Sequence, residues 1–419
     1  MMELKKYNAN HTKVLKINQI VRTVSETHRF DKDKLIAINT SDVENGVMGS
    51  GTLTSVDELK GQFKKTIVKD DILFSEIRPA NRRFAKVTTE DTKDYVVSTK
   101  LMVLRKYNED VDLEYFYYCL TNQPFLDILQ RRAENRIGSF PQITFDLLSE
   151  YAFPIPPISE QKRISSVIST LDKKIALNRA INQNLEAMAK QLYDYWFVQF
   201  DFPNKDGKPY KSSGGEMVWN EKLKRMIPKE WTNANIYQLA SISKETVNPQ
   251  AQPNELFKHY SLPEYDKTGT YAEEYGIDIQ SAKFIVTNNC ILVSKLNPWT
   301  SRVICGNRGS NQICSTEFVV WNPASLKTKG FLFMLAKSAK FIEYCTQGAT
   351  GTSHSHRRIN PELMMKFDFP YNSEIAIKFS LLIENIIVHL HNNIAQLKVL
   401  TKQRDELLPL LMNGQITIE

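Results

Sequence analysis

Two long stretches of the sequence place apolar residues at the spacing of a helix that pairs with a second helix. The first covers residues 160–197, which contain no glycine or proline and follow a proline-rich segment and a serine that can cap a helix. Its apolar positions follow a heptad seam, as in a coiled coil, with Lys174 as a polar interruption. The expected seam residues are Ile164, Val167, Leu171, Asn178, Ile181, Leu185, Met188 and Leu192.

The second stretch covers residues 373–411 and has a similar length and pattern. Asn392 and Asn393 lie in its middle, where a buried asparagine can fix the register of a helix pair. We expect it to pair antiparallel with the first helix, although two unrelated bundle helices would show the same periodicity. Its expected seam residues are Ile383, Ile386, Leu390, Leu397 and Leu400.

The sequence also resembles itself at an offset of about 219 residues, as expected for a duplicated domain. Matching blocks occur in the same order in both halves, and the last block of each half leads into its long helix. The matching blocks are residues 17–20 with 236–239, 70–83 with 289–302, 96–104 with 313–321, 115–120 with 331–336, and 143–154 with 359–370.

Each copy combines β-branched runs typical of strands with amphipathic segments typical of helices. The sequence therefore predicts an α+β fold with two similar globular domains, separated by two long antiparallel helices that form a coiled coil with pseudo-two-fold symmetry. The predicted parts are residues 1–157 (first domain), 158–200 (central helix), 201–230 (extended connector), 231–372 (second domain) and 373–419 (C-terminal helix).

Composition narrows the choice of partner and compartment. The 54 lysines and arginines exceed the 47 acidic residues, which gives a net charge of +7 and is compatible with binding a polyanion. The five cysteines contain no CxxC pair, so neither a disulfide framework nor a zinc site is indicated. No apolar run approaches the length of a membrane helix, and we expect a cytoplasmic protein.

Two similar domains at opposite ends of an antiparallel helix pair have the symmetry of a dimeric DNA reader with two half-sites. Because the two domains differ in sequence, the half-sites can differ too, which predicts an asymmetric, split DNA site. Arginine, asparagine and glutamine are the residue types that direct readout uses. In the first domain the candidates are Arg78, Asn81, Arg82, Arg83, Arg131, Arg132, Arg136, Ser139 and Gln142.

The second domain carries candidates at the equivalent places. Any single exposed arginine in a loop is more often only solvated, so the clusters matter more than their members. These candidates are Asn297, Trp299, Ser301, Arg302, Asn307, Arg308, Thr352, Ser353, His354, His356, Arg357 and Arg358.

A catalytic site is not predicted. Residues 46–52 (GVMGSGT) resemble a phosphate or adenosylmethionine loop but lack the Lys-Ser/Thr pair of a P-loop. Residues 297–299 (NPW) lack the second proline of an amino-methyltransferase site, and Glu58 and Lys60 lack the upstream Pro-Asp of a nuclease. His354 and His356 have no third metal ligand at the usual spacing.

Several motifs resemble the specificity subunit of type I restriction–modification systems, and the resemblance covers essentially the whole chain. One departure lies at residues 369–374 (FPYNSE), where the family usually repeats its Pro-Pro and Glu-Gln sequence and the start of the second helix is expected to be held more weakly. The motifs are residues 156–164 (PPISEQKRI), 171–178 (LDKKIALN), 196–202 (WFVQFDF), 207–210 (GKPY), 227–231 (IPKEW) and 407–416 (LLPLLMNGQI).

The resemblance implies two target-recognition domains, each reading half of a split site, on helices that set the spacing between the halves. It implies a non-catalytic chain that binds double-stranded DNA and two modification subunits, which hold adenosylmethionine and methylate adenine N6, and through them restriction subunits with motor and nuclease activity. In the family the helices also dock the modification subunits, which would explain further apolar residues such as Ile168, Ile175 and Leu177.

Two other classes of protein stay open. A stand-alone DNA methyltransferase or nuclease would need a cofactor motif that the sequence lacks. A coiled-coil scaffold unrelated to DNA would show neither salt-dependent DNA binding nor a methylase partner.

Overall fold

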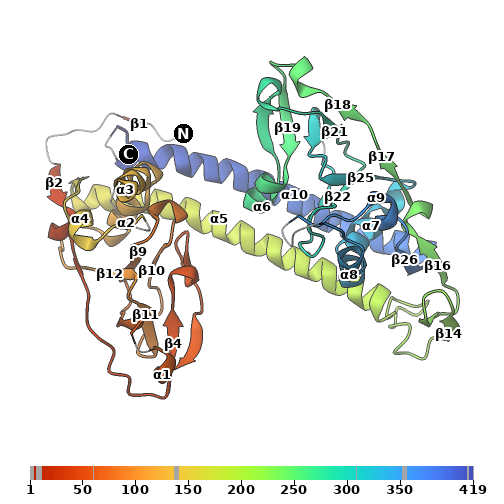
Figure 1. Cartoon of the computed structure of the whole chain (residues 1–419), viewed down its shortest axis with the longest axis horizontal. Coiled ribbons are helices and arrows are strands. Elements are labelled where there is room, and N and C mark those ends of the chain that lie inside the picture. Colours follow the sequence, from red (N-terminus) through yellow and green to blue (C-terminus); the bar gives the residue numbers. More distant parts are fainter. Residues whose placement is uncertain are drawn as a thin grey trace. The chain divides into compact units, whose positions relative to one another are not determined.

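The computed structural model describes residues 4–5, 12–59, 61–135, 141–307, 309–351, 356–412 and 415–418. The chain forms two compact units (Figure 1). Unit 1 comprises Met1–Ile175 and Val399–Glu419, and unit 2 comprises Ala176–Lys398. Each unit contains a globular domain and part of both long helices. We call the globular parts domain 1 (residues 12–157) and domain 2 (residues 201–372).

In its described residues domain 1 contains four sheets, with strand orders β10-β9-β12-β3, β7-β4-β11-β8, β13-β2 and β5-β6, and among these strands only β4 and β11 are parallel neighbours. Its strands are β2 (Lys13–Lys16), β3 (Val21–Thr23), β4 (Lys34–Ile38), β5 (Val43–Glu44), β6 (Val47–Met48), β7 (Thr52–Ser55), β8 (Phe63–Lys65), β9 (Ile72–Ser75), β10 (Phe84–Lys86), β11 (Tyr95–Ser98), β12 (Leu101–Lys106) and β13 (Ala152–Ile155). Its helices are α1 (Val56–Leu59), α2 (Leu113–Thr121), α3 (Gln123–Glu134) and α4 (Phe145–Ser149). In unit 1, β1 (Leu4–Lys5) also pairs with β27 (Thr417–Ile418).

Domain 2 repeats three of these sheets with strand orders β23-β22-β25-β17, β20-β19-β24-β21-β18 and β26-β16, and its strands β19 and β24 are parallel neighbours like β4 and β11. Its strands are β16 (Thr232–Asn235), β17 (Ala240–Ser243), β18 (Thr246–Val247), β19 (Leu256–Tyr260), β20 (Ala272–Tyr275), β21 (Lys283–Ile285), β22 (Ile291–Ser294), β23 (Val303–Cys305), β24 (Gln312–Cys314), β25 (Phe318–Pro323) and β26 (Asp368–Tyr371). Its helices are α6 (Leu262–Thr268), α7 (Lys329–Ala336), α8 (Ala339–Gln347) and α9 (Pro361–Met364).

The predicted duplication is confirmed because the matching sequence blocks fall on matching elements. Residues 70–83 and 289–302 form β9 and β22 with the turns that follow them, and residues 115–120 and 331–336 lie in α2 and α7. Even a small detail repeats: Gln19 and Gln238 each accept a hydrogen bond from the backbone N–H three residues earlier, at 2.8 Å. The two domains therefore share one fold.

The long helices complete the core of each domain. Helix α5 (Ile158–Tyr193) continues as a π-helical turn (Asp194–Val198), and α10 spans Ser373–Met412. In unit 1, Leu411 and Met412 of α10 are buried in the core of domain 1, where Met412 Sδ lies 3.4 Å from Cys119 Sγ. In unit 2, Trp196, Phe197 and Phe379 pack into the core of domain 2. Neither domain core is closed without residues from both helices.

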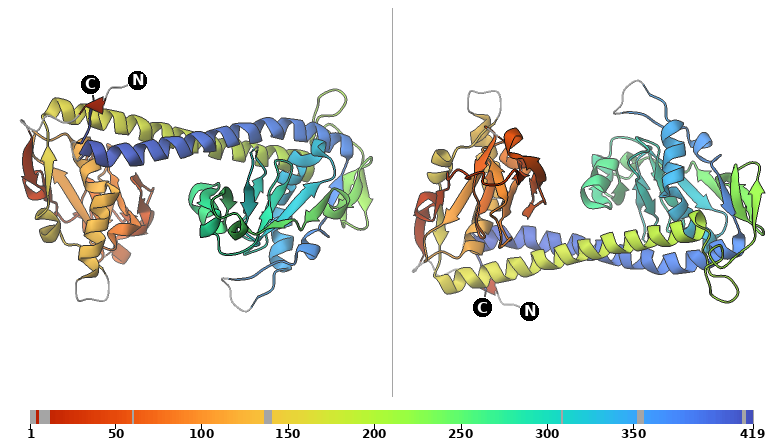
Figure 2. Two further views of the ribbon diagram at one scale, coloured as in Figure 1. Left: turned by 90° about the horizontal axis from the view of Figure 1, so that it is seen from above. Right: turned by 90° about the horizontal axis from the view of Figure 1, so that it is seen from below.

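Within each unit α5 and α10 run antiparallel, as predicted (Figure 2). In unit 1, Arg404 Nη1 donates to Asp172 Oδ1 at 3.2 Å. In unit 2, Asn178 Nδ2 donates to Gln396 Oε1 at 3.1 Å, and Asn393 Nδ2 donates to Asn182 Oδ1 at 3.0 Å. The residue number on α10 falls as that on α5 rises. Polar layers therefore interrupt the seam, and such layers fix the register of a helix pair.

The predicted seam on α5 is wrong at two positions, Ile181 and Met188. Ile181 and Met188 are 37% and 58% exposed, whereas the next residues along the helix, Asn182 and Ala189, are half-buried and buried. Ile164 is buried, and Val167, Leu171, Asn178, Leu185 and Leu192 are half-buried. On α10, Ile383 and Leu390 are buried and Ile386, Leu397 and Leu400 are half-buried. From Asn178 onward the inward-facing residues of α5 thus follow steps of four and then three residues, where the sequence suggested three and then four.

Two residues that we expected to dock a partner, Ile168 and Ile175, instead face the inside of the protein. Ile168 and Ile175 are 0% and 3% exposed, so they belong to the packed face of α5. Leu177 is 60% exposed, as expected for a docking residue.

In the described part of the chain no helix has both the length and the apolar character needed to cross a membrane.

The segment predicted as an extended connector, residues 201–230, instead contains a hairpin. Strands β14 (Met217–Asn220) and β15 (Arg225–Pro228) pair antiparallel. Before the hairpin, the rings of Phe202 and Tyr210 stack with their centroids 4.8 Å apart. Asp201 accepts hydrogen bonds of 2.7 Å from both Ser212 N and Ser212 Oγ, which lower the pKa of its carboxyl. These contacts fold the segment back on itself.

Replacing Arg404 with methionine is expected to lower the free energy of unfolding by about 1–3 kcal/mol, because the half-buried carboxylate of Asp172 loses its cation. Tyr118 Oη donates to Asp172 at 2.9 Å, so the carboxylate is held in place and cannot turn toward the solvent when the arginine is removed. Urea denaturation combined with hydrogen exchange of residues 399–412 would measure the change. The matched control is Lys402→Met on an exposed helix face, expected to change stability by less than about 0.5 kcal/mol. Equal stability of both variants would contradict the expectation.

Candidate nucleic-acid interface

A turn with the same backbone hydrogen bonds follows β9 in domain 1 and β22 in domain 2. Ser75 N donates to Arg83 O at 2.8 Å, and Ser294 N donates to Arg302 O at 3.0 Å, which closes each turn at its base. The hydroxyl of each serine also accepts from the N–H two residues later, at 3.1 and 3.2 Å. We call residues 75–83 and 294–302 the twin turns.

Each twin turn contains a residue in the left-handed conformation directly before a proline: Arg78 with φ 47° and Asn297 with φ 48°. This conformation is uncommon for residues other than glycine and requires support from its surroundings. That support comes from a second segment, because Arg78 N donates to Pro141 O at 3.0 Å and Asn297 N donates to Arg357 O at 2.8 Å. The structure therefore brings the two candidate clusters of each domain together.

Several of the candidate arginines are held inside their own domain. Arg82 donates from Nε to Asn45 Oδ1 at 2.7 Å, and burial lowers the pKa of its guanidinium. Arg83 Nη1 donates to the carbonyl of Ser41 at 3.2 Å. Arg302 forms a two-pronged pair with Asp266 at 2.6 and 2.8 Å. We assign these three arginines to holding the twin turns in place.

The other candidates divide by exposure. Gln142, Asn297 and Arg357 are half-buried. Six candidates (Arg136, Ser139, Arg308, Thr352, Ser353 and His354) lie outside the described residues. The exposed candidates are Arg78, Asn81, Arg131, Arg132, Trp299, Ser301, His356 and Arg358.

The segments considered for catalysis have structural roles where they are described. Residues 46–52 include β6, which pairs with β5, and Gly46 N donates to Phe84 O at 2.9 Å beside the first twin turn. Asn297 belongs to the second twin turn, where its Oδ1 accepts from Arg357 N at 3.2 Å. Lys60 and His354 lie outside the described residues, and among those described no group of three His, Cys, Asp or Glu side chains could hold a metal ion.

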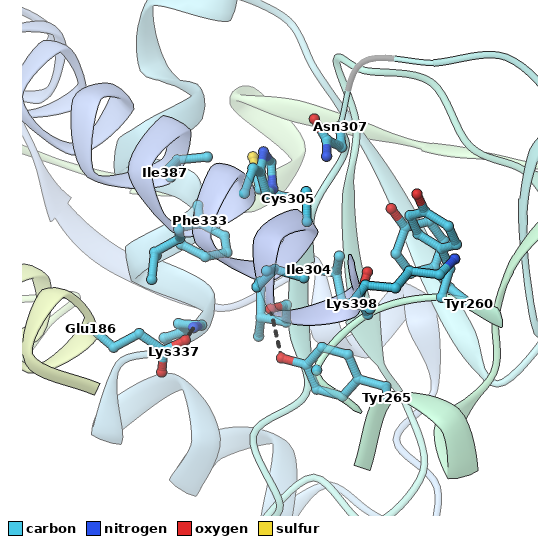
Figure 3. Close-up of a pocket in the computed structure, with 18 residues that line it drawn as sticks. Glu186, Tyr260, Tyr265, Ile304, Cys305, Asn307, Phe333, Lys337, Ile387 and Lys398 are labelled. Carbon is cyan, nitrogen blue, oxygen red and sulfur yellow. Dashed lines mark hydrogen bonds and ion pairs between the residues drawn. The ribbon is translucent and has the colours of Figure 1, made fainter. Parts of the chain in front are cut away.

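A pocket in unit 2 lies where domain 2 meets α10 (Figure 3). Tyr265 Oη donates to Val303 O at 3.4 Å, and Lys337 Nζ lies 3.5 Å from a carboxylate oxygen of Glu186. Burial lowers the pKa of His391, another residue that lines the pocket. Asn307, expected among the DNA-contacting residues, also lines it. Of these contacts, the Lys337–Glu186 ion pair joins domain 2 to α5.

Domain 2 also approaches α10 very closely at Gly330 of α7. A Cβ atom at this glycine would lie 2.9 Å from the carbonyl oxygen of Ser380, so a side chain would push the helices apart. The approach lets Phe331 N donate to Ser380 Oγ at 2.9 Å. In unit 1 the fully buried Gln161 of α5 has the corresponding role, because its Oε1 accepts from Asp112 N at 2.7 Å. The two helices therefore hold their domains through different side chains.

Comparison with known proteins identifies similar sequences and structures. Residues 13–187 match the family model described as the type I restriction modification DNA specificity domain. The specificity subunit of the type I restriction enzyme HindI from Haemophilus influenzae is 28% identical over an alignment that covers 96% of this chain and 98% of that protein. Residues 13–187 therefore belong to this domain family, and nearly the whole chain is similar to a type I specificity subunit.

A second relative in this family is the specificity subunit of the type I restriction enzyme MjaIX from Methanocaldococcus jannaschii. It is 24% identical over 73% of this chain and 69% of that protein. The crystal structure of a type I restriction–modification S subunit from M. genitalium has the same fold, with a TM-score of 0.60 and 14% identity over 97% of this chain and 98% of that one. Both curated relatives are named as specificity subunits, and the matching family model describes a DNA recognition domain rather than an enzyme.

Proposed function

We propose that this chain selects the DNA sequence on which a type I restriction–modification complex acts, with each domain reading one half of a split, asymmetric site. The observation that supports this most strongly is the pair of twin turns. Their backbones are held alike, yet they carry different side chains at equivalent positions, Arg78 against Asn297 and Ala80 against Trp299. One scaffold with two sets of contacts suits two different half-sites.

We further propose that α5 and α10 fix the number of unread base pairs between the half-sites and dock two modification subunits. Support for docking comes from apolar side chains that the helix pair leaves exposed, since contiguous exposed apolar surface is typical of binding sites. On α5 these residues are Leu177, Ile181, Met188 and Tyr195, and on α10 they are Leu381, Leu382, Val388 and Val399.

In this proposal the chemistry belongs to the partners. The modification subunits bind adenosylmethionine and methylate adenine N6 in each half-site after the base has been flipped out of the duplex. Restriction subunits with motor and nuclease activity join through them. The complex works in the cytoplasm, where the chromosomal DNA of a bacterium or archaeon lies.

Expression of the chain with its modification subunit, followed by methylome sequencing, tests the function directly. We expect a bipartite motif with one methylated adenine in each half, and DNA binding by the complex that weakens steeply as salt rises, because phosphate contacts release counterions. Two outcomes would contradict the proposal. A purified chain that methylates or cuts DNA alone would be an enzyme, and a chain without a methylase partner or salt-dependent DNA binding would be a scaffold.

A further inference from the structure

One residue position beside each twin turn is occupied by a side chain suited to reading a base. Gln142 forms an isolated antiparallel bridge with Ile77 in domain 1, and Arg358 forms the same bridge with Leu296 in domain 2. The next residue repeats a further bond, since Ile143 N donates to Glu76 O at 2.7 Å and Ile359 N donates to Lys295 O at 3.0 Å. Gln142 and Arg358 therefore occupy equivalent backbone positions.

A carboxylate holds the side chain at this position in both domains. Gln142 Nε2 donates to Glu76 Oε2 at 2.7 Å. Arg358 donates to Glu317 through Nε at 2.9 Å and through Nη2 at 3.0 Å.

The two carboxylates come from different places in the fold, because Glu76 directly follows β9 and Glu317 directly precedes β25. In domain 1, Glu76 N donates to Lys100 O at 3.0 Å, and in domain 2 the matching backbone bond joins Lys295 N to Glu317 O at 2.9 Å. Glutamate and lysine have thus exchanged places between the domains. The carboxylate nevertheless reaches the same position, which indicates that holding this side chain matters in each domain.

The hydrogen-bonding edges that remain differ between the two domains. With one amide hydrogen given to Glu76, Gln142 keeps one N–H donor and the Oε1 acceptor, which match N7 and N6 of adenine. With its Nε and Nη2 edge given to Glu317, Arg358 keeps the Nη1 and Nη2 edge, whose two donors match O6 and N7 of guanine. The Arg358 side chain is 44% exposed, so this edge is accessible to a ligand.

We propose that Glu76–Gln142 and Glu317–Arg358 are base-reading pairs, in which the carboxylate orients the reader before DNA arrives. Gln142 selects an adenine in the half-site of domain 1, and Arg358 selects a guanine in the half-site of domain 2. A side chain fixed in advance loses less conformational freedom on binding, which favours affinity and specificity. The inference rests on the proposed function and assigns readers within it.

Methylome sequencing of cells that express chain variants with the modification subunit tests the assignment. Arg358→Lys keeps the charge but loses the two-donor edge, so methylation at sites with another base at one guanine position should rise about 10- to 100-fold relative to parent. Arg358→Gln should shift the preference at that position toward adenine. In both variants the half-site of domain 1 should stay unchanged.

The corresponding changes in domain 1 should affect only the other half-site. Gln142→Ala should weaken the preference for adenine at one position, and Glu76→Gln should weaken it there to a smaller degree. In domain 2, Glu317→Gln should weaken the preference for guanine at the position that Arg358 reads, again to a smaller degree than a change of Arg358 itself. Relaxation at a single base is a result that a merely structural carboxylate would not give.

Two pairs outside the twin turns provide matched controls. Arg105 and Asp71 form a similar two-pronged pair at 2.8 and 2.8 Å with Asp71 fully buried, so Arg105→Lys should lower the melting temperature without altering the motif. Gln347 donates to Glu343 at 3.2 Å, and Gln347→Ala should leave the motif unchanged.

An unaltered motif in folded Arg358→Lys and Glu317→Gln variants would overturn the inference and leave a structural ion pair. If Arg358→Lys does not fold, the Arg358→Gln and Glu317→Gln variants decide the same question. A parent chain that directs no methylation would instead contradict the proposed function, and the two failures can therefore be told apart.

Discussion

Adding one heptad to both long helices is expected to lengthen the recognised spacer by about three base pairs. Seven helical residues add about 10 Å, and successive base pairs are about 3.4 Å apart. The insertions belong between Asn178 and Asn182 in α5 and between Asn393 and Gln396 in α10, because these positions lie between the same two polar layers. A full heptad also preserves the face that each helix turns to its partner.

Methylome sequencing would report the new spacer as the distance between the two methylated half-sites. Methylation at the parental motif should disappear, since its half-sites are about 10 Å too close together for the lengthened helices. The control is the same heptad inserted in α5 alone, which prevents both polar layers from forming together and should destabilise the helix pair. A folded double-insertion variant that keeps the parental spacer would show that the helices do not set it.

Replacing domain 1 with that of a relative that reads another sequence is expected to change one half of the motif and preserve the other. The structure defines the segment to exchange as residues 12–157 together with the end of α10, because Leu411 and Met412 are buried in the core of domain 1. Each lost base contact costs about 1–3 kcal/mol of discrimination, so a replaced set of contacts should abolish methylation at the parental half-site.

A second chimera provides the control for this exchange. It keeps the parental residues 407–412 under the foreign domain 1, so the new core meets side chains that it does not fit. We expect this chimera to read the same motif as the matched one but to melt at a lower temperature. Changes in both half-sites in the matched chimera would show that the domains do not read DNA independently.

The paired helices and the duplicated domain could be predicted from the sequence because both leave long, regular patterns. The predicted seam failed where the inward-facing residues are Asn182 and Ala189, since a polar amide and a methyl group do not stand out in an apolar pattern. The more hydrophobic Ile181 and Met188 beside them took their places in the prediction, although the structure leaves both exposed. Hydrophobicity alone does not show which residues of a helix face a partner that also carries polar layers.

The candidate interface could be predicted only in part. The arginine clusters could be recognised because their members are neighbours in the sequence. The sequence could not show that Arg302 is paired with Asp266, which lies 36 residues away in the chain. Glu76 and Glu317 gave no signal, because a search for side chains that bind phosphates and base edges passes over carboxylates. Their relation to Gln142 and Arg358 depends on strand pairing that brings distant residues into contact.

The burial of Leu411 and Met412 in domain 1 also bears on how the protein is made. A ribosome synthesises these residues after all of domain 2, so the first domain to emerge waits for its last core residues while the second is completed. Multidomain proteins usually mature from the N-terminal end. Here the order is reversed at the final step, and a nascent chain broken off within α10 would release an N-terminal domain with an open core, a target for chaperones and proteases.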